Sequence, residues 1–182
     1  MIAPQESASA GLAVHQMANI LALDQSSHTT GYAVFKDDKP IVISHFDAQG
    51  GSDLGARLEW IRNKVISLIN EYEITEVVFE DIQLQDVNGS RETGIKTFKM
   101  LAEVFGVIHE LVQELDVNYT IVPPIVWKAT FKIAGKGRAQ EKKMAQAYVL
   151  NTYGIKCTED EADATCIGAH YIKKSTTELN WD

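Results

Sequence analysis

Short apolar runs alternate with amphipathic stretches along the chain, and each pattern predicts one kind of element. Residues 19–24 predict a buried strand, because an apolar run there ends on Asp24 and is followed by Gln-Ser-Ser. Residues 31–36 and 40–47 predict two further strands with a turn, Asp37-Asp38-Lys39, between them. These three strands should form an antiparallel meander.

Helical periodicity begins after Ser52 or Asp53, either of which can cap the first helix. Apolar residues then recur at spacings of three and four, at Leu54, Leu58, Ile61, Val65, Leu68 and Ile69. Residues 75–80 form the next apolar run, which again ends on a carboxylate, Glu80. Because a helix intervenes, this strand should return parallel to an earlier one, so that the two carboxyl ends meet at one edge.

A second long helix should follow the polar loop at 83–92. Its apolar stripe runs through Ile95, Phe98, Ala102, Phe105, Ile108 and Val112. We interpret this stripe mainly as core, with a face against a second subunit as the alternative. A fifth strand is expected at 119–122, closed by Pro123-Pro124, and further helices at 139–151 and from Glu159. This order of strands and helices predicts an α/β fold with a mixed five-stranded sheet flanked by helices.

Length and composition favour a single globular domain. The chain has 182 residues, of which 45% are hydrophobic and 23% charged, the usage of an ordinary globular protein. We expect residues 1–16 to be a disordered leader or an expression remnant, 17–174 the folded domain and 175–182 a tail. The apolar runs are too short to span a membrane. Cys157 and Cys166 lack a CxxC spacing, which argues against a disulfide framework or a zinc knuckle and favours the cytoplasm.

The charge is distributed unevenly. The formal net charge is -8, but residues 127–143 hold six Lys or Arg and one acid, a net charge of +5. The remainder holds 11 basic and 24 acidic residues, a net charge of -13. The chain therefore combines a cationic segment with an acidic body, and its overall charge does not exclude DNA as a partner.

Carboxylates stand at three points where apolar structure ends: Asp24, Glu80, and the run from Asp160 to Asp163. Each has an ordinary explanation, as a turn residue, a strand-end surface acid or a complement to a helix dipole. Their combination is more telling, because ligands of open α/β sheets bind outside the carboxyl ends of the strands. Asp160 and Asp163 would also share one helical face.

Converging carboxylates need a cation or a proton, because two unit charges 4 Å apart repel by about 4 kcal/mol at an effective dielectric of 20. No His or Cys stands at a matching spacing, so Mg²⁺ or Mn²⁺ is favoured over zinc. Such clusters commonly hold two metal ions, which assist an in-line displacement at phosphorus. The pattern indicates nuclease chemistry.

Three motifs, residues 24–35, 77–81 and 160–164, resemble in order and spacing the RuvC-type Holliday-junction resolvases of the ribonuclease H-like superfamily. The resemblance covers residues 19–173. It implies that the metal ligands are Asp24, Glu80, Asp160 and Asp163, with Glu161 able to replace Asp160. It further implies a homodimer that depends on Mg²⁺, with Mn²⁺ as a substitute and two ions per active site. The reaction implied is paired symmetric nicking of Holliday junctions and related branched DNA.

The cationic segment fits the same resemblance. Val126-Trp127-Lys128 resembles the stretch that supplies a DNA-contacting lysine in this family. Residues 137–143 resemble the stretch that sets a lysine near the scissile phosphate, which makes Lys142 the expected catalytic lysine and Lys143 its alternative. The predicted DNA contacts are Lys128, Arg138, Lys142, Lys143 and His28. A solvated helix face is the other interpretation of the lysines, and His28 is either a phosphate contact or an ordinary surface residue.

Two departures distinguish the chain from cellular members of that family. The first motif reads Asp24-Gln25-Ser26 where those members usually have Asp-Pro-Gly, which is closer to phage-encoded relatives and suggests action in the cytoplasm of a bacterial host cell. Gln83 stands where they carry an aromatic wedge. Since a stacked aromatic ring contributes about 1–3 kcal/mol, we expect looser junction and sequence selectivity, with Leu84 as a weak apolar substitute.

Two other functions remain open. A non-catalytic branched-DNA-binding module would use only the cationic segment, and titration with Mg²⁺ would distinguish it. An ATPase of the actin and sugar-kinase type shares a ribonuclease H-like core, but it needs two lobes and glycines after the first Asp. Gly135 and Gly137 form a GxG without the rest of a phosphate loop, so no nucleotide cofactor is expected. His45, His109 and His170 are interpreted as half-buried structural residues.

Overall fold

Five strands form one mixed sheet in the computed structural model of the protein, which describes residues 18–84 and 89–178. The predicted leader at 1–16 and the last residues of the predicted tail lie outside the described residues. The strands are β1 (Ile20–Asp24), β2 (Thr29–Lys36), β3 (Lys39–Asp47), β4 (Glu76–Glu80) and β5 (Asn118–Val122). Their order across the sheet is β3-β2-β1-β4-β5.

The first three strands form the predicted antiparallel meander, and the other two run parallel to β1. β1 pairs with β2 and β2 with β3 in antiparallel fashion, whereas β1 pairs with β4 and β4 with β5 in parallel. The first four residues of both β1 and β4 are buried, and each strand ends on a half-buried acid, Asp24 or Glu80. The parallel pairing therefore brings the two acids to the same edge of the sheet, as predicted.

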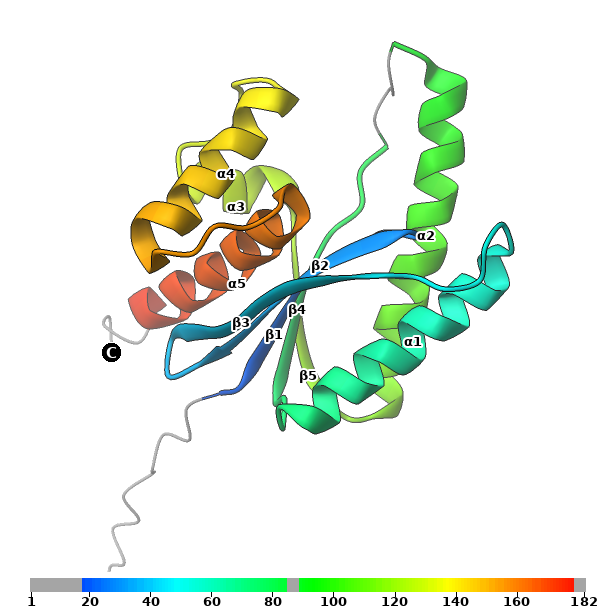
Figure 1. Ribbon diagram of the computed structural model, residues 1–182, viewed down its shortest axis with the longest axis horizontal. Coiled ribbons are helices and arrows are strands. Elements are labelled where there is room, and N and C mark those ends of the chain that lie inside the picture. Colours follow the sequence, from blue (N-terminus) through cyan, green and yellow to red (C-terminus); the bar gives the residue numbers. More distant parts are fainter. Residues whose placement is uncertain (1–17, 85–88, 179–182) are drawn as a thin grey trace, which may run out of the picture.

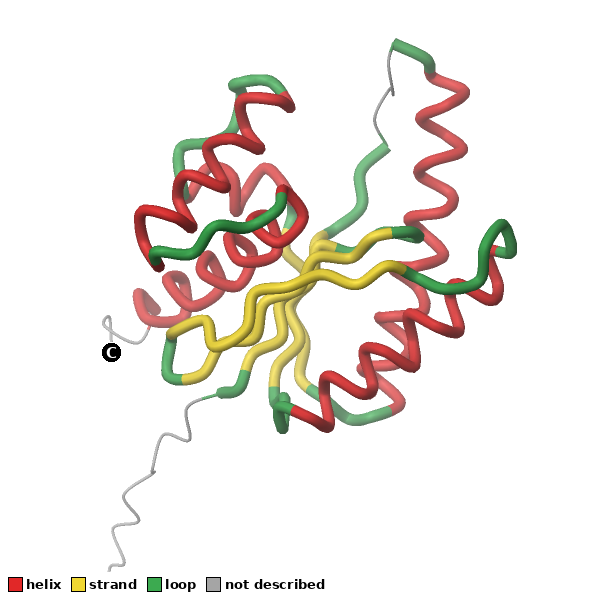
Figure 2. The backbone as a smooth tube through the Cα atoms, viewed as in Figure 1, coloured by secondary structure: helices red, strands yellow, loops and turns green. Residues whose placement is uncertain are grey.

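The helices cover the two faces of the sheet in separate groups (Figure 1; Figure 2). α1 (Leu54–Glu71) and α2 (Arg91–Glu114) pack on one face, and α3 (Pro124–Thr130), α4 (Arg138–Tyr153) and α5 (Glu159–Glu178) on the other. Alternate strand residues supply the two cores, because successive side chains of a strand point to opposite faces. Leu21 and Leu23 of β1 lie in the core with α1 and α2, whereas Ala22 lies in the other core.

α5 approaches the sheet unusually closely at two glycines. A Cβ atom added at Gly31 of β2 would collide with the backbone of Asp160 in the first turn of α5. One added at Gly168 of α5 would collide with the Phe35 ring and approach Ala22. The absence of side chains at these two positions lets α5 lie flat across β1 and β2 and sets the height of its first turn above the sheet.

The predicted helices are present, and one helix was missed. Asp53, one of the two predicted caps, accepts a hydrogen bond from the backbone N–H of Ala56. The missed element is α3, because the Pro123-Pro124 pair was interpreted only as the end of a strand. Proline is also well suited to the first turn of a helix, where its missing N–H has no intrahelical partner, and Pro124 occupies that position in α3.

The prediction that the α2 stripe is core is right for one half of the helix and wrong for the other. Val104, Ile108 and Val112 are completely buried, but Ile95 is 39% exposed. The N-terminal half of α2, which holds Ile95, extends beyond the edge of the sheet, as Figure 1 shows.

Two smaller predictions concern disulfides and membrane spans. Both cysteines are free thiols, as expected. Within the described segments, no helix has the combination of length and apolar character that crossing a bilayer requires.

Candidate active site

A pocket of about 520 Å³ lies at the edge of the sheet where β1 and β4 end. It is lined by the ends of these strands, by α2 on one side, and by α3, α4 and the first turn of α5 on the other. Its described lining includes all four predicted metal ligands and the predicted catalytic lysine: Asp24, Glu80, Asp160, Asp163 and Lys142. Three segments that are distant in sequence thus contribute acids to one pocket.

The acids of this pocket interact electrostatically. Burial raises the pKa of Asp24 well above its usual range, and the negative charges of Glu80 and Asp163 raise it further. Burial also raises the pKa of Glu80 to about 7 and that of Asp163 to about 6. Lys142 opposes these shifts at Asp24 and Asp163. The pocket therefore concentrates more negative charge than its own cations neutralise.

This charge excess is what a divalent cation would relieve. Within residues 18–84 and 89–178, no three His, Cys, Asp or Glu side chains are already gathered closely enough to hold a metal ion. The described pocket lining offers carboxylate oxygens and contains no His or Cys. This donor chemistry fits Mg²⁺ or Mn²⁺ and does not fit zinc.

The three lysines and the arginine that are predicted to contact DNA differ in their positions. Lys142 lies 3.0 Å from a carboxylate oxygen of Glu159 and 3.6 Å from one of Asp160. Although burial lowers the pKa of Lys142, these acidic neighbours outweigh it and raise the pKa overall. Lys128 and Arg138 also line the pocket, whereas Lys143 is exposed on α4 and is not among the residues that line it. His28 is likewise exposed and outside the described lining.

Glu161, predicted as a replacement ligand for Asp160, is engaged elsewhere. Its carboxylate accepts a hydrogen bond of 2.7 Å from the backbone N–H of Thr158, and the Thr158 hydroxyl accepts one from the Glu161 N–H. This reciprocal pair is a capping box at the start of α5. The other carboxylate oxygen of Glu161 lies 2.7 Å from His45 Nδ1 on β3. Of the two alternatives, Asp160 is the one that lines the pocket.

His45 was predicted to be half-buried and purely structural, and this is wrong in one respect. His45 is exposed, and the hydrogen bond of its ring to Glu161 links the start of α5 to the sheet. The hydrogen bond to Glu161 raises the pKa of His45. No sequence pattern indicates this contact, because the two residues are 116 positions apart.

Three contacts to pocket residues were not predicted. The Trp127 indole Nε1–H donates a 2.7 Å hydrogen bond to Glu80 Oε1. The Gln25 side chain pairs with the Glu80 backbone, donating to its C=O at 2.6 Å and accepting from its N–H at 3.2 Å. Glu141 bonds Lys128 Nζ at 3.0 Å. A tryptophan in the core does give a general signal, since its buried N–H needs an acceptor.

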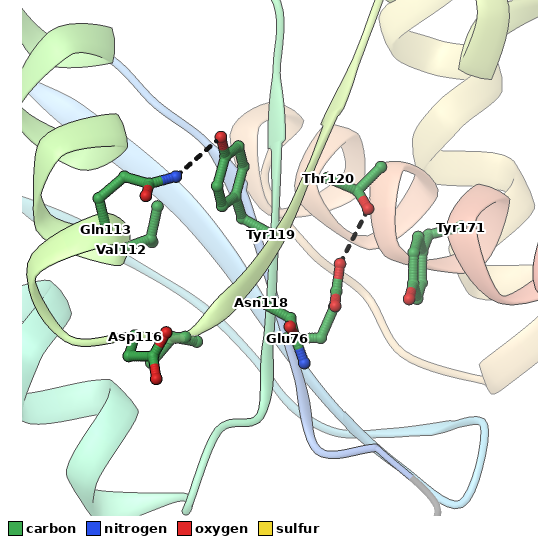
Figure 3. A pocket seen from close by; sticks show the side chains of 9 residues that line it. Glu76, Val112, Gln113, Asp116, Asn118, Tyr119, Thr120 and Tyr171 are labelled. Atoms are coloured by element: carbon green, nitrogen blue, oxygen red, sulfur yellow. Dashed lines mark hydrogen bonds between the residues drawn. The ribbon is translucent and has the colours of Figure 1, made fainter.

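A second pocket, of about 410 Å³, lies at the opposite end of β4 and β5. Figure 3 shows Glu76 there, hydrogen-bonded by the Thr120 hydroxyl at 2.8 Å, and Gln113 bonded to the Tyr119 hydroxyl. The described lining contains no Lys or Arg. Its one buried acid already has hydroxyl partners, so this pocket lacks the unneutralised charge of the first.

The sheet order is that of the predicted ribonuclease H-like fold, and acids line the pocket at its carboxyl edge. A scan against protein-family models finds no match. The chain is 27% identical to the crossover junction endodeoxyribonuclease RuvC of Dictyoglomus thermophilum over 161 residues, which cover 85% of this chain and 96% of the relative. The corresponding enzyme of Dictyoglomus turgidum is 26% identical with the same coverage.

Solved structures share the fold. Thermus thermophilus RuvC in complex with a Holliday junction matches with a TM-score of 0.67 at 14% identity, over 88% of this chain and 96% of that one. The fowlpox virus resolvase bound to Holliday junction DNA matches with a TM-score of 0.57 at 17% identity, over 86% and 98%. The resemblance to RuvC-type Holliday-junction resolvases that the three motifs indicate is confirmed, and so is the predicted fold class.

Proposed function

We propose that this protein is a crossover junction endodeoxyribonuclease, a metal-dependent enzyme that resolves Holliday junctions and related branched DNA by paired symmetric nicks. The observation that carries the proposal is the gathering of Asp24, Glu80, Asp160 and Asp163, with Lys142, around one pocket at the carboxyl edge of the sheet. The similarity to two curated enzymes of that name supports the same activity.

Each pocket residue has a defined role in this proposal. The four carboxylates would hold Mg²⁺, or Mn²⁺ in its place, with two ions per site. When bound, these ions supply charge neutralisation at the scissile phosphate and a water of lowered pKa. The Lys142 ammonium lies within reach of Asp160 and would form an ion pair with the phosphate as negative charge develops there. The half-buried strand ends keep Asp24 and Glu80 in fixed positions.

The remaining contacts concern DNA and a second subunit. Lys128 and Arg138 line the pocket and would bind phosphates near the cut, with Lys143 and His28 as outer contacts. We place the homodimer face on the N-terminal half of α2, where Ile95 is 39% exposed and the sheet ends. Two sites related by a twofold axis would then cut two strands symmetrically.

Substrate selectivity and origin are part of the proposal. Gln83 lines the pocket, Leu84 follows it in the chain, and both are exposed and non-aromatic. We therefore expect the enzyme to accept forks or flaps as well as four-way junctions. We propose a phage or prophage origin, from the Asp24-Gln25-Ser26 motif, and action in the cytoplasm of the host cell.

The experiment is nicking of synthetic four-way junctions by the purified protein, with Mg²⁺ and with chelator. Asp24→Asn should keep junction binding and lose nicking, because the shape is preserved and one metal-binding charge is removed. Lys36→Ala, in an exposed residue at the far end of β2, is the matched control. Unchanged nicking by Asp24→Asn, or nicking in excess chelator, would contradict the proposal. Junction binding without any nicking by the wild-type chain would favour the binding module instead.

A further inference from the structure

Glu80 is held from two directions by side chains that are not themselves metal ligands. Trp127 of α3 bonds one oxygen of its carboxylate, at 2.7 Å. Gln25, directly after β1, bonds both polar groups of its backbone, at 2.6 and 3.2 Å. Trp127 is 1% exposed and Gln25 6%, so water does not compete for these bonds.

Both partners of the hydrogen bond from Trp127 to Glu80 are stabilised by it. The indole Nε1–H is a donor only, and a buried donor that lacks an acceptor is destabilising. The carboxylate is itself largely buried, and an N–H donor stabilises its ionised form. Because the indole carries no charge, it orients Glu80 without neutralising it. A lysine in the same place would compete with a metal ion for the carboxylate.

Gln25 has a different effect. β1 and β4 pair in register only as far as Leu23 and Phe79. The Gln25 amide then bonds the next residue of β4, Glu80, in place of a further ladder pair. The connection fixes the position of the Glu80 backbone relative to the end of β1, and Asp24 is the residue next to Gln25.

We propose that Trp127 and Gln25 are positioning residues that preset Glu80 for metal binding, Trp127 by orienting the carboxylate and Gln25 by fixing its backbone. The inference rests on the proposed function, since it assigns a role to Glu80 as a ligand. Trp127 bonds Oε1, so Oε2 is the oxygen that would bind the metal ion. Groups of this kind typically alter metal affinity by about 10- to 100-fold.

The test is Mn²⁺ binding to the DNA-free protein, measured by isothermal titration calorimetry, together with the Mn²⁺ dependence of junction nicking. Trp127→Phe removes the N–H and retains most of the ring. We expect its Mn²⁺ affinity to fall at least tenfold, with a nicking rate that recovers in part at high Mn²⁺. Trp60→Phe is the matched control, because Trp60 packs against Phe46 in the other core and should bind Mn²⁺ like the wild type.

Gln25 is tested in the same assay. Gln25→Leu loses both bonds to the Glu80 backbone at similar volume, and we expect the same loss of Mn²⁺ affinity. Gln25→Glu keeps the acceptor for the Glu80 N–H but loses the donor, so its affinity should fall less than that of Gln25→Leu. Equal affinity in Gln25→Leu and wild type would remove Gln25 from the proposal and contradict it.

A measurement on the native chain covers the case in which Trp127→Phe fails to fold. The indole N–H of Trp127 should shift in a ¹H–¹⁵N spectrum when Mg²⁺ is added and when Glu80 is replaced by Gln, while that of Trp60 stays in place. An indole resonance that responds to neither change would contradict the proposal, as would Mn²⁺ affinity of Trp127→Phe within twofold of wild type. If the wild type nicks junctions but these residues have no effect, only the positioning role fails. If the wild type neither binds Mn²⁺ nor nicks, the proposed function fails as well.

Discussion

β4 begins with Glu76 and ends with Glu80, and the two acids differ in their neighbours more than in their burial. Burial raises the pKa of both. Glu76 meets hydroxyl groups, from Thr120 at 2.8 Å and from Tyr171, which satisfy it without any charge (Figure 3). Glu80 meets an indole N–H and the charges of Lys128 and Asp163. One strand therefore carries a self-contained acid at one end and an acid that still needs a cation at the other.

The difference follows from the direction of the strands. At the Glu76 end, β4 and β5 begin, and the groups that meet the acid are uncharged hydroxyls, from Thr120 of β5 and Tyr171 of α5. At the Glu80 end, β1 and β4 finish side by side, and α5 lays its first turn over the same edge (Figure 1). Parallel pairing thus brings the carboxyl ends of β1 and β4, and with them Asp24 and Glu80, to one edge, the edge at which ligands of open α/β sheets bind.

The largest expected effect comes from a comparison of substitutions at Glu80 and Glu76, the acids at the two ends of β4. Glu80→Gln should reduce junction nicking by more than about 100-fold, because it removes a direct ligand and such losses exceed those of supporting groups. Glu76→Gln should leave nicking within about threefold, since its hydroxyl partners can bond an amide equally well. Nicking rates on a synthetic junction under saturating Mg²⁺ measure both. Equal losses in the two variants would mean that Glu80 acts only through the fold.

A second variant tests whether the distance between α5 and the sheet determines the geometry of the site. Gly31→Ala places a methyl group against the backbone of Asp160. We expect a loss of about 1–3 kcal/mol in the free energy of unfolding and of about 100-fold in nicking, because a displacement of about 1 Å has effects of that size. Gly106→Ala in α2 is the control, since a Cβ there meets nothing within 4 Å. Chemical denaturation and nicking assays would contradict the idea if Gly31→Ala behaved like Gly106→Ala.

Most of the fold could be predicted from the sequence, because it depends on local patterns. The strands that end on Asp24 and Glu80 show apolar runs, and the first two long helices show a clear 3.6-residue period. The location of Asp160 and Asp163 at the same edge followed only from the ordered motifs. The indole bond to Glu80 and the link from His45 to Glu161 could not be predicted, because side-chain contacts across a sheet edge leave no periodic signal.

Two errors have the same physical origin. α3 was missed since Pro-Pro ends a strand and also starts a helix, and the sequence alone does not say which effect operates. Ile95 continues the period of the α2 stripe, but the period shows only which side of the helix is apolar. It does not show where the sheet beneath that side stops. Local patterns identify elements, whereas the extent of their contacts is set by the tertiary structure.

A smaller effect concerns the pH dependence of stability without metal. The pKa of Glu80 is raised to about 7 and that of Asp163 to about 6. A raised carboxyl pKa means that the folded state binds the proton more tightly than the unfolded state does. The resulting contribution to stability is therefore complete below the unfolded-state pKa and is lost as pH rises through the folded-state pKa. The free energy of unfolding of the metal-free protein should therefore fall by on the order of 2 kcal/mol between pH 5 and 8, because of the acids at the Glu80 end of β4.

Urea denaturation in chelator at both pH values measures this loss. Glu80→Gln should reduce the loss and Mg²⁺ should offset it, since each removes the cost of the buried charge. Comparison of wild type with Glu80→Gln cancels the contribution of His45, whose raised pKa acts in the same direction. A pH dependence that is identical in the two proteins would place the unneutralised charge somewhere other than at Glu80.

The smallest expected effect tests which cations at the Glu80 end contact DNA. Lys128 lines the pocket and bonds Glu141 in the free protein, so a DNA phosphate must replace that carboxylate. Lys143, in contrast, is exposed and lies outside the described pocket lining. If Lys128 binds a phosphate, Lys128→Ala should lower the slope of log K against log salt by about 1. Glu141→Gln should strengthen junction binding slightly, because it removes the competitor while it keeps the side-chain shape. Filter binding to a junction at several salt concentrations in Ca²⁺ measures the slopes. If Lys128→Ala keeps the wild-type slope and Lys143→Ala lowers it, the DNA phosphates lie along the outer face of α4 and not at the pocket mouth. Lys128 would then serve only to balance the charge of Glu80.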